Sequence, residues 1–301
     1  MTSTQQMLVA VFKSMRLPFV SLSVLCVLVA FSLAHYHHVE LELVDMLIIT
    51  VGAVAAHIAV NTLNEYQDYR SGLDFHTNKT PFSGGSGALI AYPLADKWVL
   101  IMTALSLVIC VLIGGYFVYK QGWYIVPFGV IGIAIIVLYT RYLNSHPLLC
   151  LIAPGLAFGG LMFIASNLLL TGSVSLASLL LASIISLLVS NILLLNQFPD
   201  ADIDKQFGRN HVVIAYGEQK ALTIYMCFWL LAVSLLVISV VMAVLPTMML
   251  LTLLPLAIGI RIFNGVRRAD SQQKLVICLA WNIIMANSAL LTMSTSLWLG
   301  K

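Results

Sequence analysis

The hydrophobic residues of this chain gather in long blocks that charged residues rarely interrupt. Blocks of about 18 or more such residues are long enough to cross a bilayer as α-helices. Nine blocks meet this requirement, at residues 17–34, 46–63, 98–119, 123–140, 148–170, 175–198, 221–245, 247–263 and 275–298. The pattern predicts an all-α, multi-pass membrane protein. Its nine transmembrane helices are expected to enclose a central cavity in one domain over residues 1–301.

Composition removes the alternative of a water-soluble protein. Of the 301 residues, 60% are hydrophobic and only 9% are charged, whereas an average soluble domain has about 25% charged residues. So few charges cannot cover a water-facing surface, and we expect a lipid bilayer, and no nucleic acid, as the partner. The five cysteines lie in or at the edges of apolar blocks without a Cys-x-x-Cys pair, which indicates packing residues.

The basic residues predict the orientation of the nine helices. With a cytoplasmic N-terminus, Lys120 and Lys301 are the two of the 15 lysines and arginines that fall on the outer side. Cytoplasmic loops of membrane proteins carry an excess of lysine and arginine. No small-residue cleavage site follows the first block, so we expect it to remain as an uncleaved helix. The prediction is a bacterial inner-membrane protein with a cytoplasmic N-terminus.

Acidic residues are concentrated at two places, where the second and the sixth predicted helices reach the cytoplasmic side. The first acidic segment, residues 64–74, contains Asn64, Glu65, Asp68, Gly72 and Asp74. The second acidic segment, residues 196–209, contains Asn196, Asp200, Asp202, Asp204, Lys205 and Arg209. Both contain Asn-x-x-x-Asp, which suggests a weak internal repeat.

Helical spacing predicts which of these side chains share a face. Residues four apart do so in an α-helix, so Asn64 aligns with Asp68. Asn196, Asp200 and Asp204 align if the helix continues through Pro199. In the first segment a bend at Gly72 is expected to bring Asp74 back toward the site, and Asp202 is expected to face away.

Like-charged carboxylates one helical turn apart repel each other, so something must offset the charge. Mg²⁺ does so with oxygen ligands, and it prefers one or two carboxylates together with waters and substrate phosphates. Two carboxylate sets facing each other across a cavity mouth would bind a diphosphate through such ions. Nearby cations fit this hypothesis: Lys79 follows the first segment, Lys205 and Arg209 belong to the second, and Arg141 ends the fourth block beside Tyr139.

Simpler interpretations remain open for several of these residues. The acidic segments match a solvated helix end with mixed charge, and Arg70, Lys79 and Arg141 match cations that only set topology. His57 fits an interior histidine with satisfied hydrogen bonds better than a ligand. The glycine-rich loop, residues 81–87, is by itself weak evidence for an anion site.

At these motifs the chain resembles the UbiA superfamily of intramembrane prenyltransferases, over nearly its whole length. Asn64-Glu65-Tyr66-x-Asp68-x-x-x-Gly72-x-Asp74 is similar to the N-D-Y-x-D-x-x-x-G-x-D pattern of the menaquinone branch, the 1,4-dihydroxy-2-naphthoate polyprenyltransferase-like members. Asp200-x-x-x-Asp204 followed by Gly208 is similar to the second motif of that branch. Departures are Glu65 for Asp, which keeps the charge so that metal binding is expected to survive, Pro199 for Arg, His211 for Thr, and the glycine-rich loop.

The resemblance implies a Mg²⁺-dependent transfer of a polyprenyl group from polyprenyl diphosphate to an aromatic acceptor through an allylic carbocation. It implies metal ligation by Asp68, Asp74, Asp200 and Asp204, with Asn64 and Asn196 as neutral ligands or orienting groups. It implies a diphosphate neutralised by Lys79, Arg141, Lys205 and Arg209, beside Tyr139. Tyr66 and Tyr69 are further candidates, with Tyr139, for shielding the cation by their ring faces. Two alternatives stay open: a non-aromatic acceptor, and a divalent-cation transporter or channel.

Overall fold

The computed structural model of this protein describes residues 2–300, and within them all regular structure is helical. The α-helices are α1 (Ser3–Ser14), α2 (Val20–Tyr36), α3 (Leu43–Ser71), α4 (Ala88–Ala91), α5 (Asp96–Gln121), α6 (Val126–Leu138), α7 (Pro147–Gly155), α8 (Ile164–Thr171), α9 (Leu176–Asn196), α10 (Ala201–Gln206), α11 (Val212–Tyr216), α12 (Glu218–Val241), α13 (Leu253–Leu256), α14 (Ile258–Arg267) and α15 (Gln272–Leu299). Short 3₁₀ turns join several of them, and a π-helical stretch, η6 (Leu156–Phe163), links α7 to α8. The all-α prediction is confirmed.

The predicted transmembrane helices correspond one to one to helical stretches of the described chain. Eight are long and apolar enough to cross a membrane: Thr4–Tyr36, Leu43–Ser71, Pro93–Gln121, Pro147–Thr171, Leu176–Asn196, Glu218–Val241, Thr247–Arg267 and Gln272–Leu299. A ninth apolar stretch, Trp123–Leu138, is shorter. Lys301, predicted to face the outer side, lies outside the described residues.

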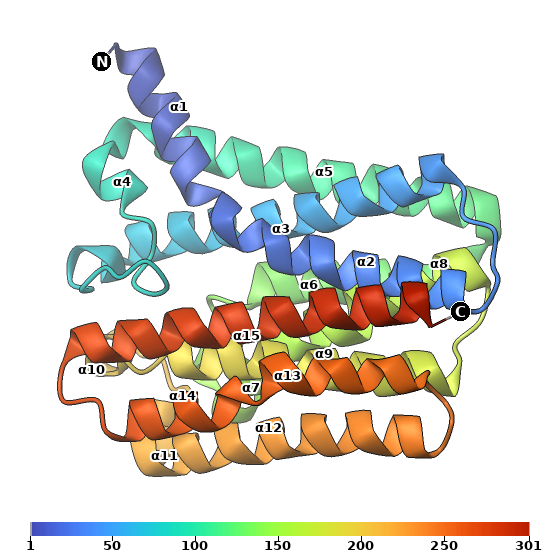
Figure 1. The fold of residues 1–301 in the computed structure, drawn as a ribbon. Coiled ribbons are helices and arrows are strands. Elements are labelled where there is room, and N and C mark those ends of the chain that lie inside the picture. Colours follow the sequence, from blue (N-terminus) through green and yellow to red (C-terminus); the bar gives the residue numbers. More distant parts are fainter. Residues whose placement is uncertain (1, 301) are drawn as a thin grey trace.

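The long helices lie side by side in a bundle (Figure 1), in which α3 packs against α5, α2 against α15, and α9 against α12. The short helices α4 and α10 gather at one end of this bundle, and α8 and the C-terminus lie at the other (Figure 1). Because α3 and α9 both end near α4 and α10, the two acidic segments come to the same end of the molecule.

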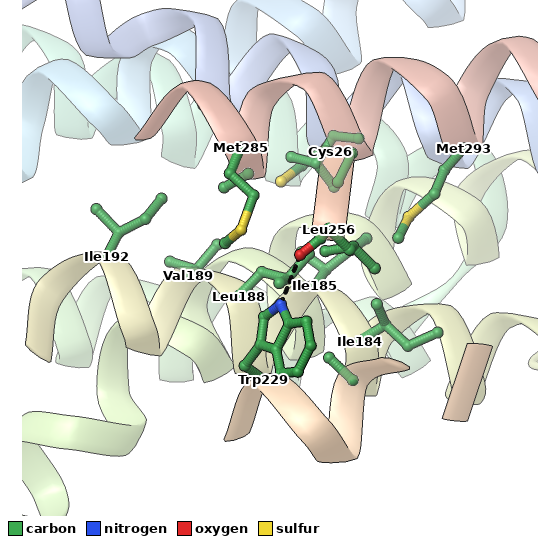
Figure 2. Packing of buried hydrophobic residues seen from close by; sticks show 14 of the residues in the cluster. Cys26, Ile184, Ile185, Leu188, Val189, Ile192, Trp229, Leu256, Met285 and Met293 are labelled. Atoms are coloured by element: carbon green, nitrogen blue, oxygen red, sulfur yellow. Dashed lines mark hydrogen bonds between the residues drawn. The ribbon is translucent and has the colours of Figure 1, made fainter. Parts of the chain in front are cut away.

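The main hydrophobic core surrounds α9 (Figure 2). Ile184, Ile185 and Leu188 of α9 are 0%, 0% and 1% exposed. Trp229 of α12 packs against them and donates its ring N–H to the backbone oxygen of Leu256 at 2.8 Å. A buried indole N–H needs such a partner, and this bond ties α12 to α13 beside α9.

The α7–η6–α8 stretch approaches α9 closely because its facing residues are small. A Cβ atom added at Gly155 or Gly159 would collide with the backbone oxygens of Ser186 and Ala182. Ser186 also donates its hydroxyl to the backbone oxygen of Gly155 at 2.9 Å. Small residues at helix crossings let backbones approach in this way, so the second acidic segment starts from a firmly packed helix.

Candidate functional site

A polar cavity of about 130 Å³ lies at the end of the bundle where the two acidic segments meet. Its lining contains the four carboxylates predicted as metal ligands, and all are buried: Asp68, Asp74, Asp200 and Asp204, which are 6%, 2%, 8% and 3% exposed. The structure therefore brings together residues that stand more than a hundred positions apart in the sequence.

The first acidic segment reaches this cavity through one unbroken helix and a bend. The helix α3 continues to Ser71 and carries Asp68 in its last turn. Gly72 then takes a left-handed backbone conformation, with φ of 87°, which glycine adopts without steric cost. The following turn, η2 (Leu73–Phe75), presents Asp74 to the same cavity. The predicted bend at Gly72 is confirmed.

The second acidic segment is built differently, and the condition for its predicted alignment, a helix that continues through Pro199, is not met. The helix α9 ends at Asn196, and Pro199 lies in the turn before α10. Asn196, Asp200 and Asp204 therefore do not share one helix face, because proline cannot continue the hydrogen-bond ladder of a helix. Asp200 instead begins a new helical turn, in which the backbone N–H of Asp204 donates to the backbone oxygen of Asp200 at 2.8 Å.

Arg209 joins the two acidic segments. One of its guanidinium nitrogens donates to Asp204 at 3.0 Å, and the other donates to Asp68. All three side chains are at least four-fifths buried. The Nε2 atom of His211 lies 3.3 Å from the second oxygen of Asp204. A planar guanidinium suits such a two-carboxylate contact, so Arg209 balances one carboxylate from each segment.

Asp74 and Asp200 are the two carboxylates that this arginine does not pair. Asp74 Oδ2 and Asp200 Oδ1 are buried without a hydrogen-bond partner among the described residues. Burial raises the pKa of Asp74 to about 7, and the Glu65 and Asp68 carboxylates add to the shift. Burial likewise raises the pKa of Asp200 to about 6, with a contribution from Asp204. Both groups gain from a cation that replaces the missing partners.

The donor set fits Mg²⁺ as an ion shared with a substrate. Among residues 2–300, no three His, Cys, Asp or Glu side chains converge closely enough to hold a metal by themselves. Mg²⁺ does not require this, because it uses one or two carboxylates with phosphate oxygens and waters. The two unpaired carboxylate oxygens supply such ligands, one from each acidic segment.

The glycine-rich loop is bound to protein carboxylates, which the sequence did not indicate. The backbone N–H of Gly84 donates to Asp200 Oδ2 at 2.9 Å. Glu65 accepts from the backbone N–H groups of Ser86 and Ala88 at 2.8 and 3.1 Å, and from the Ser86 hydroxyl at 2.6 Å. Glu65 was predicted to keep the charge of the usual Asp for metal binding, but it binds the loop and lies outside the polar cavity lining.

Some of the predicted cationic side chains lie near the site and others do not. Lys79 Nζ lies 4.0 Å from Asp74, with a side chain that is 31% exposed. Arg141 is exposed, with its guanidinium 5.7 Å from the ring centre of Tyr142, and Lys205 is also exposed. Neither Arg141 nor Lys205 lines the polar cavity. Asp202 is exposed, in agreement with the predicted direction of its side chain.

The polar cavity adjoins a larger, mostly apolar cavity of about 440 Å³ inside the bundle. The two cavities share the lining residues Arg16, Asn64, Phe82, Tyr139, Leu193 and Asn196. Thr140 orients Asn64 by donating its hydroxyl to the amide oxygen at 2.9 Å. The predicted positions of Asn64, Asn196 and Tyr139 are thus at the junction between a charged compartment and an apolar one.

Sequence reasoning missed several lining residues. Arg16 was assigned only to topology, yet it lines both cavities from a left-handed backbone conformation with φ of 49°. Asn144 and Gln197 lie outside the matching motif positions, and no periodicity marks them. His57 lines the apolar cavity, and within residues 2–300 only its Nδ1 has a hydrogen-bond partner, the Ser23 hydroxyl at 3.3 Å. The expectation of a fully satisfied histidine is therefore wrong.

The sequence is similar to known prenyltransferases. Residues 23–284 match the profile of the UbiA prenyltransferase family. A curated relative, the 1,4-dihydroxy-2-naphthoate octaprenyltransferase of Bacillus subtilis (strain 168), is 28% identical over 193 residues, covering 62% of this chain and 60% of the relative. The match thus spans about three fifths of that relative's length.

The fold is similar to solved structures at low sequence identity. The apo UbiA homologue of Aeropyrum pernix K1 has a TM-score of 0.69 at 16% identity, covering 89% of this chain and 96% of that one. The Archaeoglobus fulgidus UbiA homologue bound to DMAPP and Mg²⁺ has a TM-score of 0.65 at 15% identity, covering 94% and 99%. A structure concerning digeranylgeranylglyceryl phosphate synthase has a TM-score of 0.69 at 14% identity, covering 97% and 99%. These likenesses show the fold.

Proposed function

This chain belongs to the UbiA prenyltransferase family, and we propose that it transfers a polyprenyl group from polyprenyl diphosphate to an aromatic acceptor in a Mg²⁺-dependent reaction. The observation that carries the proposal is the junction of the two cavities, where four buried carboxylates stand at the mouth of an apolar chamber. A polyprenyl diphosphate has the same division, with a charged end and an apolar tail.

The polar cavity would bind the diphosphate. Asp68, Asp74, Asp200 and Asp204 would hold Mg²⁺, which supplies positive charge that stabilises the diphosphate leaving group. Arg209 is already in the cavity wall and can turn its guanidinium from carboxylate to phosphate oxygens, since both groups offer a pair of anionic oxygens to its two N–H donors. Asn64 and Asn196 would orient the oxygen that joins the prenyl group to the diphosphate, at the junction of the two cavities.

The reaction begins when the allylic carbon–oxygen bond breaks and both bonding electrons remain on the diphosphate. The resulting allylic carbocation is attacked by a carbon of the electron-rich ring, and the ring then loses a proton. Water would capture the cation first, so the reacting carbon must lie in a dry place. The junction supplies one, because Phe82 and Tyr139 line it and the apolar cavity continues behind them.

The position of Tyr139 supports its proposed role in shielding the cation with its ring face. Tyr66 and Tyr69, the other two candidates, pack instead against a small apolar cluster around Ala88 and Val99. Phe82, which no motif suggested, is the second aromatic side chain at the junction. We therefore assign the shielding of the cation to Tyr139 and Phe82.

We propose 1,4-dihydroxy-2-naphthoate as the acceptor, on the strength of the curated relative and of the first acidic motif. A channel for divalent ions is less compatible with the structure, because the carboxylates lie at the end of the bundle beside an apolar chamber. The site is proposed to face the cytoplasm of a bacterial inner membrane, in keeping with the distribution of the basic residues.

The test is prenyl transfer by purified protein in liposomes that contain a polyprenyl diphosphate and Mg²⁺. The naphthoate, a phenolic acid and a glycerol phosphate are supplied in parallel, and products are identified by mass spectrometry. We expect a prenylated naphthoate that disappears when EDTA removes the metal. Consumption of the diphosphate only with the glycerol phosphate would reject the aromatic acceptor. Divalent-ion flux without any consumption of diphosphate would reject the enzyme.

A further inference from the structure

Glu65 is the one acidic residue of the first acidic segment whose buried carboxylate does not face the polar cavity. It is 2% exposed and follows Asn64 on α3. Its two oxygens accept three hydrogen bonds, from the backbone N–H groups of Ser86 and Ala88 and from the Ser86 hydroxyl. These three donors from the loop and the start of α4 satisfy the Glu65 carboxylate. It therefore does not share its hydrogen-bond partners with the carboxylates of the polar cavity.

The other part of the same loop touches one carboxylate from each acidic segment. The backbone N–H of Gly84 donates to Asp200 Oδ2 at 2.9 Å. At Gly85 an added Cβ atom would lie 2.6 Å from Asp74 Oδ1, so the loop backbone lies directly against that carboxylate. Asp74 and Asp200 also each keep a buried oxygen that has no hydrogen-bond partner among the described residues.

We propose that Glu65 is a positioning residue, which holds the glycine-rich loop so that Gly84 and Gly85 fix the Asp200 and Asp74 carboxylates for cation binding. The proposal rests on the function given above. It connects the two acidic segments by a continuous path: α3 carries Glu65, Glu65 holds Ser86 and Ala88, and Gly84 holds Asp200. Glu65 itself touches neither the metal nor the diphosphate.

A direct role of Glu65 as a metal ligand predicts a different result in protein without metal. If Glu65 holds the loop, its loss frees the loop amides whether or not Mg²⁺ is present. If Glu65 binds only metal, the loop amides of metal-free protein do not respond to its loss. Hydrogen exchange of the loop in metal-free, substrate-free protein therefore distinguishes the two roles, and it does not depend on any enzymatic activity.

The first experiment measures exchange of peptides covering residues 80–88 in the full chain in detergent micelles with EDTA. In Glu65→Gln we expect the amides of Ser86 and Ala88 to exchange about tenfold faster than in the wild type, because charge-assisted bonds are lost. Glu218→Gln makes the same chemical change at an exposed position in the first turn of α12 and leaves the loop unaffected. Unchanged loop exchange in Glu65→Gln overturns the proposal.

A second experiment links the loop to cation binding. The apparent affinity for Mg²⁺ with inorganic pyrophosphate is read from the rise of the melting temperature with ligand concentration. We expect the half-saturating Mg²⁺ concentration to rise about tenfold in Glu65→Gln, as is typical for groups that orient metal ligands. Glu65→Asp retains the charge and is expected to recover part of both effects. A loop that exchanges faster while Mg²⁺ affinity stays at the wild-type value overturns the positioning role.

A milder variant guards against a folding defect in Glu65→Gln. Ser86→Ala removes the hydroxyl donor at 2.6 Å and leaves both backbone donors in place. We expect a smaller increase in loop exchange, about threefold, and a correspondingly small loss of Mg²⁺ affinity. If Ser86→Ala and Glu65→Gln change neither quantity, Glu65 does not position the loop. Failure of the wild type to transfer prenyl groups would reject the proposed function and leave these readouts intact.

Discussion

The two acidic segments arrive at the same cavity by different backbones. The first runs along an unbroken helix, α3, and turns at Gly72. The second leaves α9 at Asn196, passes Pro199 and restarts as α10. Their shared Asn-x-x-x-Asp pattern thus does not reflect a shared local structure. What recurs is the outcome, in which each segment delivers two buried carboxylates to the polar cavity.

The four carboxylates also fall into two pairs, and each pair contains one residue from each acidic segment. Asp68 from the first and Asp204 from the second are paired by Arg209. Asp74 from the first and Asp200 from the second are touched by the glycine-rich loop, and each keeps a buried oxygen without a hydrogen-bond partner in the described part of the chain. One carboxylate of each segment is therefore already neutralised, while the other is left to a cation.

Substitutions Asp68→Asn and Asp200→Asn test whether the two acidic segments contribute equally to metal binding. Each is expected to lower kcat/KM for prenyl transfer by about 1,000-fold, because a neutral amide loses the charge that holds the metal. The control is Asp202→Asn, which alters an exposed acid of the second segment that lies outside the cavity lining. Wild-type turnover in either variant would show that the metal assignment is incorrect.

The bridge between the segments is tested by Arg209→Gln. We expect kcat/KM for the polyprenyl diphosphate to fall about 100-fold, since a buried charge-assisted contact is lost and two carboxylates stay unbalanced. The apparent melting temperature of metal-free protein should fall as well, and Mg²⁺ should restore part of it. Arg267→Gln, at an exposed position in α14, provides the matched control. Equal melting temperatures for both variants would argue against the bridge.

The pH dependence of Mg²⁺ binding tests Asp74 and Asp200, the two carboxylates that Arg209 does not pair. The pKa values of Asp74 and Asp200 are raised to about 7 and about 6, so protons compete with the cation as the pH falls. The half-saturating Mg²⁺ concentration for prenyl transfer should rise about tenfold from pH 8 to pH 6. Conversely, metal-free protein should lose stability as the pH rises through 6 to 7, because its folded state binds these protons more tightly than the unfolded one. A flat profile would contradict the assignment.

The bend of the first segment is tested by Gly72→Ala. A left-handed alanine costs about 1 kcal/mol of stability, and any relaxation of the bend moves Asp74. Gly172→Ala alters another left-handed helix end, with φ of 69° and free space around it, at the end of α8. We expect similar losses of melting temperature in both, with a severalfold loss of Mg²⁺ affinity only in Gly72→Ala. Equal affinities would show that the bend is not needed.

Much of the fold and part of the site follow from the sequence, for identifiable reasons. Bilayer thickness fixes the length of an apolar block, so the helices were predictable one by one. The four aspartates were predictable because charge in an apolar chain is costly and stands out. The alignment of Asn196, Asp200 and Asp204 depended on a helix that continues through Pro199, and α9 ends before that residue. Glu65 was assigned to metal binding by its charge, although its partners are loop amides.

The remaining errors concern long side chains and loops. Lys205 follows Asp204 directly and Arg141 lies two residues after Tyr139, yet their exposed side chains lie away from the cavity lining. Arg16 reaches both cavities from a segment with no motif. Such placements depend on how a connection turns after a helix ends, and hydrophobic periodicity carries no information about that turn.

The length of α3 limits how much of a prenyl tail can be bound beside it. Ile49 lines the inner part of the apolar cavity and Asp68 lines the polar one, and the helix rises about 28 Å between them. A prenyl tail that extends farther than this from its diphosphate must leave the bundle and lie among lipid acyl chains. The protein would then measure only the first isoprene units, and the bilayer would accommodate the rest without regard to their number.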